Sequence, residues 1–127
     1  MESAQKNILI IEDNRDLATL LAERIGSYGF TISSAYDGKA GLEKARASKP
    51  DLILLDLMMP KMDGRAVIME LKLDESTRNI PIIILTAVDD SFNREFTIEL
   101  GASAYITKPV EPGALLKIIK DVLAEIN

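Results

Sequence analysis

Three acidic residues follow short aliphatic runs, and their types and spacing predict a metal-dependent site. Glu12 and Asp13 come directly after the run at residues 8–11, and Asp56 comes directly after the run at residues 52–55. Carboxylates held close together repel one another, and a hard divalent cation bound through oxygen relieves that repulsion. The sequence therefore predicts a Mg²⁺ site built on Glu12, Asp13 and Asp56.

Two further polar residues, Thr86 and Lys108, follow later apolar runs. Mg²⁺ and an ammonium group stabilise phosphoryl oxygens, a hydroxyl adds a hydrogen-bond donor, and a carboxylate can act as the nucleophile toward phosphorus. Asp56 stands alone after its run, whereas Glu12 and Asp13 are adjacent and better placed to hold a metal. We therefore expect Asp56 to accept a phosphoryl group and form an acyl phosphate.

Five apolar runs must form the strands that position these residues. The runs lie near residues 7–11, 30–35, 51–55, 81–85 and 103–107, and helical patterns separate them. This alternation is typical of an α/β fold in which helices cover both faces of a parallel sheet. In such folds ligands bind at the carboxyl ends of the strands, so the polar residues that follow the runs are expected to meet there.

Amphipathic helices are expected between and after these strands. The first begins at Asn14, has an apolar face of Leu17, Leu20, Leu21 and Ile25, and is stopped by Gly29. The second begins at Asp37, and the third follows Gly64. The fourth is capped by residues 89–91, ends at Gly101 and has few apolar residues. The last has a dense apolar face of Leu115, Leu116, Ile119, Val122, Leu123 and Ile126.

The composition narrows the classes of function. A length of 127 residues with 47% apolar and 28% charged residues fits one soluble domain, and no apolar run approaches the roughly 18 residues of a membrane span. The absence of cysteine and histidine excludes thiol nucleophiles, Ser-His-Asp arrangements and common zinc sites. A formal charge of −5 argues against direct contact with nucleic acid. Because residues 1–6 show no secretory signal, we expect a cytoplasmic protein.

The order of the polar residues resembles the receiver domain of two-component response regulators. The resemblance covers essentially the whole chain and consists of Ile11-Glu12-Asp13-Asn14, Asp56 with Pro60, Asp63-Gly64, Thr86-Ala87 and Lys108-Pro109. It implies one receiver domain over residues 1–127. It also implies a doubly wound, flavodoxin-like fold with five helices and a five-stranded parallel sheet ordered 2-1-3-4-5.

The same resemblance implies a role for each site residue. Asp56 is the phosphoacceptor, and Thr86 and Lys108 contact the phosphoryl group. The implied Mg²⁺ ligands are Glu12, Asp13, Asp56 and the backbone carbonyl of Met58. Thr86 and Tyr105 form a switch in which the aromatic ring turns inward on activation. The switch then changes the output face for signal transduction.

The resemblance further implies the partners. The phosphoryl group comes from a phosphohistidine on a sensor histidine kinase or a histidine phosphotransfer domain, as in a phosphorelay. The phosphorylated form acts on a downstream protein or an attached output domain. No enzymatic activity is expected beyond autocatalytic phosphorylation and dephosphorylation. The sequence leaves open whether activation produces a homodimer and whether the chain is a complete regulator.

Three alternatives share the fold or the chemistry. A flavin-binding module would place phosphate near Glu12 and Asp13, which would repel it. A hydrolase with an aspartyl-phosphate intermediate usually carries a second acid two residues after the nucleophile, where this chain has Met58. A protein-interaction module that is not phosphorylated would not need Asp56, Thr86 and Lys108 together.

Overall fold

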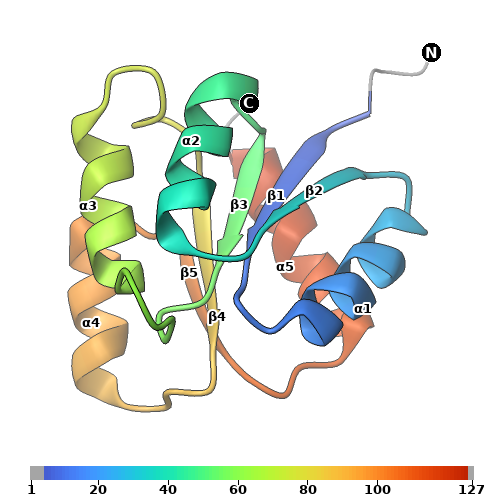
Figure 1. The fold of residues 1–127 in the computed structure, drawn as a ribbon. Coiled ribbons are helices and arrows are strands. Elements are labelled where there is room, and N and C mark those ends of the chain that lie inside the picture. The colour runs from blue at the N-terminus through green and yellow to red at the C-terminus, as the bar shows by residue number, and fades with distance from the viewer. Residues whose placement is uncertain (1–4, 126–127) are drawn as a thin grey trace.

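The computed structural model of the protein describes residues 5–125, which form five strands and five helices (Figure 1). The strands are β1 (Asn7–Ile11), β2 (Thr31–Ala35), β3 (Leu52–Leu55), β4 (Ile82–Thr86) and β5 (Ala104–Thr107). The helices are α1 (Arg15–Gly26), α2 (Gly38–Ser48), α3 (Gly64–Leu73), α4 (Ser91–Leu100) and α5 (Pro112–Glu125). All strands pair in parallel in the order β2-β1-β3-β4-β5, which confirms the predicted fold.

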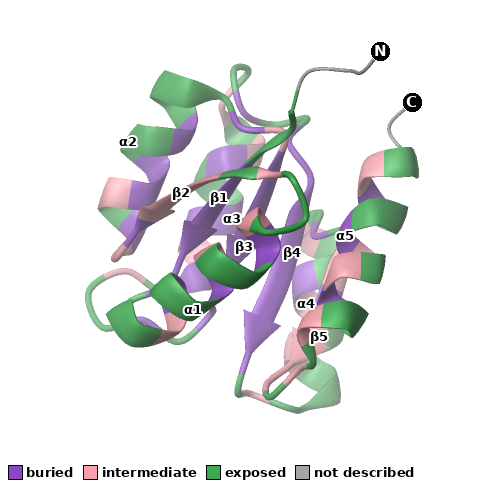
Figure 2. Ribbon diagram, turned by 90° about the vertical axis from the view of Figure 1, so that its right-hand side faces the viewer, coloured by how far each residue is buried: buried purple, intermediate pink, exposed green. Residues whose placement is uncertain are grey.

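Helices cover both faces of the sheet (Figure 1). Helices α1 and α5 pack on one face, and α2, α3 and α4 pack on the other. Strands β3 and β4 are buried at every residue (Figure 2). Their side chains alternate between the two faces, with Ile53 and Leu55 on the α2–α3 side and Leu52 and Leu54 on the α1–α5 side. The continuous aliphatic runs of the sequence therefore form strands buried on both faces.

Side-chain caps fix the beginnings of four helices. In each case a side-chain oxygen accepts a backbone N–H of the first turn, and the capping residues are Asn14, Asp37, Asp63 and Asp90. The predicted beginnings at Asn14 and Asp37 are confirmed. Helix α4 ends at Gly101, whose φ of 118° lies in the left-handed region that glycine adopts readily, so that end is confirmed as well.

Two expectations about α1 are wrong. The helix ends at Gly26, and Gly29 instead lies in the following turn with a φ of 102°. Leu20 is not a core residue, because its side chain is 48% exposed. The buried face of α1 includes Ala18 in place of Leu20 and consists of Ala18, Leu21 and Ile25.

The last two helices differ in how firmly they are held. In α5 the apolar face contains the buried Leu115, Ile119 and Val122, whereas the predicted Ile126 lies outside the described residues. In α4 the residue that is buried is Thr97, and Phe92 is 71% exposed. The predicted scarcity of apolar contacts in α4 is therefore confirmed. Within residues 5–125, no helix combines the length and hydropathy needed to cross a bilayer.

Candidate functional site

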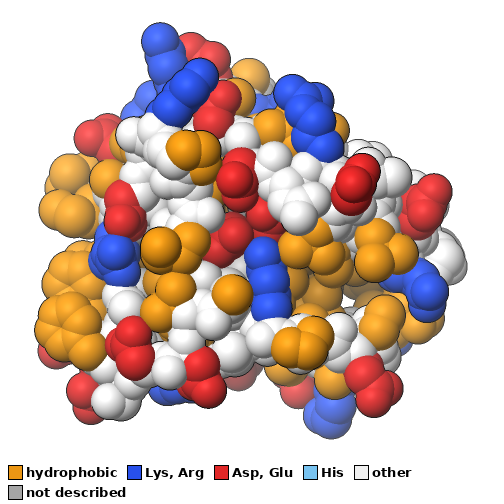
Figure 3. Space-filling view, turned by 60° about the horizontal axis from the view of Figure 1, so that its bottom comes forward, with side chains coloured by type: hydrophobic (Ala, Val, Ile, Leu, Met, Phe, Trp, Pro, Cys, Tyr) orange, Lys and Arg blue, Asp and Glu red, His pale blue; other side chains and the backbone are white. Residues whose placement is uncertain are grey.

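The predicted polar residues lie at one edge of the sheet. Glu12 follows β1, Asp56 follows β3, Thr86 ends β4 and Lys108 follows β5. Because the strands are parallel, their carboxyl ends lie at the same edge. Figure 3 turns this edge toward the viewer and shows acidic side chains gathered near its centre beside a basic one, with apolar side chains around them.

Glu12, Asp13 and Asp56 form the predicted carboxylate cluster. One oxygen atom from each side chain lies within 4.8 Å of the other two. Glu12 and Asp56 are only 3% and 6% exposed, whereas Asp13 is open to solvent. A set of carboxylate oxygens that is partly buried and open on one side suits a hard cation such as Mg²⁺.

Lys108 joins the two buried carboxylates. Its Nζ atom donates to Glu12 Oε1 at 2.7 Å and to Asp56 Oδ2 at 3.1 Å. The cluster therefore brings three carboxylates and one ammonium group together. Removing one partner from a buried ion pair typically costs about 3–5 kcal/mol, because a desolvated charge remains. The positive charge of Lys108 therefore offsets the desolvation of the Asp56 carboxylate.

The local environment shifts the proton affinity of Glu12 and Lys108. Burial raises the pKa of Glu12 above its ordinary value, although hydrogen bonds from Lys108 and the Asn14 N–H oppose the increase. Burial alone would lower the pKa of Lys108, but its contacts with Glu12 and Asp56 outweigh burial and raise the pKa. Lys108 therefore keeps its positive charge at neutral pH. A cation at this edge would offset the desolvation of Glu12.

Tight packing of the β3–α3 loop holds Asp56 in place. The Met58 N–H donates to Asp56 Oδ1 at 3.1 Å. The Gly64 N–H donates to the Leu57 carbonyl at 2.9 Å. A Cβ atom at Gly64 would lie 2.6 Å from Leu57 Cα and 2.7 Å from the Asp56 carbonyl oxygen. The glycine of the Asp-Gly pair is therefore required by this close approach.

Thr86 and Tyr105 both contact Val88, in the segment that follows β4. Thr86 is fully buried, and its hydroxyl oxygen accepts the Val88 N–H at 3.3 Å. Tyr105 is 7% exposed, and its hydroxyl donates to the Val88 carbonyl. Within residues 5–125, Thr86 forms no hydrogen bond with Asp56. The structure thus places both predicted switch residues around the segment that follows β4.

Sequence reasoning missed Arg94, which holds Tyr105 from α4. The guanidinium carbon of Arg94 lies 4.7 Å from the centre of the Tyr105 ring. Its Nη1 atom also donates to the Tyr105 carbonyl at 3.1 Å. The cation–π contact packs the Tyr105 ring against α4, and the hydrogen bond ties the β5 backbone to the same helix. No local pattern joins an arginine in the middle of a helix to a strand residue, so only the fold reveals this pair.

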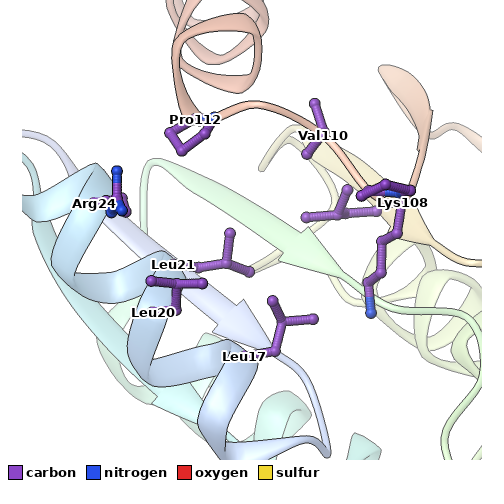
Figure 4. A pocket seen from close by; sticks show the side chains of 9 residues that line it. Leu17, Leu20, Leu21, Arg24, Lys108, Val110 and Pro112 are labelled. Carbon is purple, nitrogen blue, oxygen red and sulfur yellow. The ribbon is translucent and has the colours of Figure 1, made fainter.

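An apolar groove borders the site. It has a volume of about 430 Å³ and lies between α1 and the segment that joins β5 to α5 (Figure 4). Leu17, Leu20 and Leu21 form one side, Val110 and Pro112 form the other, and Lys108 stands at one end. The exposure of Leu20 is thereby explained by its position on the wall of this groove.

Fold and site together define the class of receiver domains in two-component signalling. The chain belongs to the response regulator receiver domain family, whose sequence pattern matches residues 8–120. It is 39% identical to the alkaline phosphatase synthesis transcriptional regulatory protein PhoP of Bacillus subtilis. That match extends over 118 residues, which are 93% of this chain and 48% of the relative. The chain thus spans about half the length of this curated relative.

Solved structures of receiver domains have the same fold as this chain. A CheY-like response regulator receiver domain protein from Methanospirillum hungatei superposes with a TM-score of 0.91 at 28% identity, covering 97% of both chains. The BeF3-activated N-terminal receiver domain of Klebsiella pneumoniae RstA superposes with a TM-score of 0.86 at 32% identity. That match covers 92% of this chain and 97% of the RstA domain. The chain is therefore a receiver domain of the two-component signalling type, a class of signalling phosphoacceptors.

Proposed function

We propose that Asp56 accepts the phosphoryl group from a phosphohistidine on a sensor histidine kinase or a histidine phosphotransfer domain. The observation that carries this assignment is the buried Asp56 carboxylate, which shares Lys108 with Glu12 and lies within metal-binding reach of Asp13. A carboxylate oxygen attacks phosphorus, the bond from phosphorus to the histidine nitrogen breaks, and the imidazole leaves. The product is an acyl phosphate on Asp56.

The metal site is assigned to four oxygen donors: Glu12, Asp13, Asp56 and the backbone carbonyl of Met58. Bound Mg²⁺ supplies positive charge that lowers the repulsion between carboxylates and phosphoryl oxygens. Glu12 is held by Lys108 and by the Asn14 N–H, so its position is fixed before metal binds. The Lys108 ammonium group donates to the Asp56 carboxylate before transfer, and it is close enough to donate to the phosphoryl oxygens afterwards.

Thr86 and Tyr105 are assigned to the switch. A phosphoryl group on Asp56 attracts the Thr86 hydroxyl as a donor, and the Thr86 hydroxyl then leaves the Val88 N–H. The Tyr105 hydroxyl holds the same segment through the Val88 carbonyl. Because few apolar contacts hold α4, a shift of residues 86–88 can move that helix at low cost. Helix α4 with β5 and α5 is the proposed output face.

We assign the remaining partners by class. Residues 1–127 form one receiver domain that acts through a downstream protein or an attached output domain. The relative PhoP is a transcriptional regulatory protein about twice as long as this chain, which supports an attached output domain. The proposed location is the cytoplasm. The domain itself is not proposed to contact nucleic acid or a membrane, or to turn over an external substrate.

Phosphorylation by a small-molecule donor tests this function. We expect the wild-type chain to gain the mass of one phosphoryl group when it is incubated with acetyl phosphate and Mg²⁺. The gain is expected to disappear when EDTA removes the metal, because the carboxylate cluster then repels the incoming anion. Intact-protein mass spectrometry makes the measurement. Continuous release of inorganic phosphate would support the hydrolase, and an unchanged mass would support an interaction module.

The groove beside Lys108 is the proposed docking site for the phosphohistidine donor. Because Lys108 stands at one end of the groove, a donor bound there brings its histidine close to Asp56. We expect Leu20→Glu to slow phosphotransfer from a purified, radiolabelled histidine kinase about tenfold, because a charge then faces an apolar partner. Phosphorylation by acetyl phosphate should not change. Gel autoradiography over time measures both rates.

Leu73→Glu is the matched control for the docking prediction. Leu73 is also an exposed leucine, at 79%, but it lies at the end of α3 and outside the groove. The control variant is expected to receive phosphate at the wild-type rate from both donors. Equal rates for Leu20→Glu and the wild type with the kinase would place the docking site elsewhere.

A further inference from the structure

Thr107 carries a buried hydroxyl that has no explanation in the phosphoacceptor site described so far. Its Oγ1 atom is inaccessible to solvent and has no hydrogen-bond partner among residues 5–125. A buried hydroxyl without a partner is unfavourable, and native proteins keep few of them. Every other buried side-chain polar atom in the described part of the chain has a partner. We therefore asked which group could pair with the Thr107 hydroxyl in another state of the protein.

The position of Thr107 connects it with the switch residues. In the register of β4 and β5, Thr107 is the direct partner of Thr86. Tyr105 faces the α2–α3 side, whereas Ala104 and Ile106 face the α1–α5 side. Because strand residues alternate, Thr107 shares the face of Tyr105. By the same rule Thr86 shares the face of Ile84, which also lies on the α2–α3 side.

Thr86 has a replaceable hydrogen bond on that face. Its hydroxyl oxygen accepts the Val88 N–H over 3.3 Å, which is long for a bond of this kind. A threonine hydroxyl has one proton to donate, and within residues 5–125 no hydrogen bond joins Thr86 to Asp56. We therefore expect the Thr86 side chain to rotate when it donates that proton to a phosphoryl oxygen on Asp56. Rotation leaves the Val88 N–H without its acceptor. The neighbouring hydroxyl on this face is that of Thr107.

We propose that Thr107 is a positioning residue for the phosphorylated state. When Thr86 turns its hydroxyl toward the phosphoryl group, the hydroxyl of Thr107 gains a hydrogen bond to the segment at residues 86–88 that Thr86 releases. This inference rests on the proposed phosphorylation of Asp56 and adds a residue that acts through Thr86. Thr107 touches neither the phosphoryl group nor the metal, so it is not a catalytic residue.

The hydroxyl of Thr107 then favours one of the two states. It is unpaired in the arrangement that the structure shows and paired after Thr86 turns, so it lowers the free energy of the switched state relative to the resting state. A group that favours the switched state also raises the affinity for any ligand that selects that state. Removing the hydroxyl is therefore expected to stabilise the free protein and to weaken binding of a phosphoryl analogue.

Beryllofluoride binding to four proteins tests the proposal. Beryllofluoride serves as the probe because it activates the related RstA receiver domain. The proteins are the wild type, Thr107→Val, Thr107→Ser and Thr77→Val. Thr77 is the matched control, since it is a buried threonine whose hydroxyl donates to the Leu71 carbonyl at 2.7 Å, away from the switch. Thermal melting with and without Mg²⁺ and beryllofluoride gives the midpoints, and titration gives the affinities.

The expected pattern separates positioning from simple packing. For Thr107→Val we expect the melting midpoint of the free protein to rise by about 3 °C and the affinity for beryllofluoride to fall about fivefold. Thr107→Ser keeps the hydroxyl and is expected to restore affinity. Thr77→Val should lower both midpoints equally and leave affinity unchanged. In NMR spectra, the Val88 amide resonance should differ between Thr107→Val and wild type more in the bound form than in the free form.

Each other outcome overturns a specific claim. Unchanged beryllofluoride affinity in Thr107→Val would show that the hydroxyl does not distinguish the two states, and the inference would be wrong. Equal lowering of both midpoints by Thr107→Val would show that the hydroxyl is paired in both states, with the same consequence. Failure of the wild type itself to bind beryllofluoride would instead contradict the proposed phosphorylation site, and the inference would fail with it.

Discussion

Replacing Asp56 with asparagine is expected to abolish phosphorylation by both acetyl phosphate and a histidine kinase. An amide cannot supply the carboxylate oxygen that attacks phosphorus, and neighbouring Glu12 is engaged with Lys108. The loss should be complete within detection by mass spectrometry, which makes this the largest effect predicted for a single substitution. The protein is expected to remain folded, since asparagine has the same shape and can still accept from the Met58 N–H.

Asp51→Asn is the matched control for this experiment. Asp51 precedes β3 at the opposite end of the strand, where its Oδ2 atom accepts the Asn7 N–H at 2.7 Å. The substitution therefore changes the same functional group far from the carboxylate cluster. Phosphorylation at the wild-type rate is expected for Asp51→Asn. Residual phosphorylation of Asp56→Asn would assign the acceptor to another side chain.

Gly64→Ala is expected to produce the largest loss of stability. A Cβ atom at this position would lie 2.6 Å from Leu57 Cα and 2.7 Å from the Asp56 carbonyl oxygen. Both contacts are to backbone, which cannot move aside as a flexible side chain can. We expect the free energy of unfolding to fall by about 3 kcal/mol and the melting midpoint by roughly 10 °C. Because the clash pushes on Asp56, the rate of phosphorylation should fall as well.

Gly113→Ala provides the control for glycine replacement. Gly113 lies in α5, and a Cβ atom there would meet no atom within 4 Å. Alanine favours the helical conformation over glycine by about 1 kcal/mol, so this variant is expected to be as stable as the wild type or more stable. Denaturant unfolding of both variants makes the comparison. Equal stability of Gly64→Ala and the wild type would contradict the described packing of the β3–α3 loop.

The sequence predicts β1, β3 and β4 well because these strands are buried on both faces. Runs such as residues 8–11 and 52–55 contain only aliphatic side chains, and that pattern is simple to detect. The grouping of the site residues could be predicted because the sheet is parallel. In a parallel sheet the position of a residue after its strand determines the edge at which it lies, so Glu12, Asp56 and Lys108 could be placed together. The order of the strands came from resemblance to receiver domains.

Features that depend on contacts between distant elements could not be predicted. Leu20 has the spacing of a core residue, but it lies on the wall of a groove that exists only because the β5–α5 segment passes nearby. Arg94 packs on Tyr105 through the docking of α4 against β5. The unpaired hydroxyl of Thr107 is defined by what surrounds it, and a sequence does not show which atoms those are.

Locating the phosphoryl group on the chain tests the central claim most directly. After incubation with acetyl phosphate and Mg²⁺, borohydride reduces an aspartyl phosphate to homoserine, and peptide mass spectrometry identifies the altered residue. The account predicts homoserine at position 56 and at no other position. Modification at Glu12 or Asp13, or no modification in a folded protein supplied with Mg²⁺, would contradict the assignment of Asp56 as phosphoacceptor.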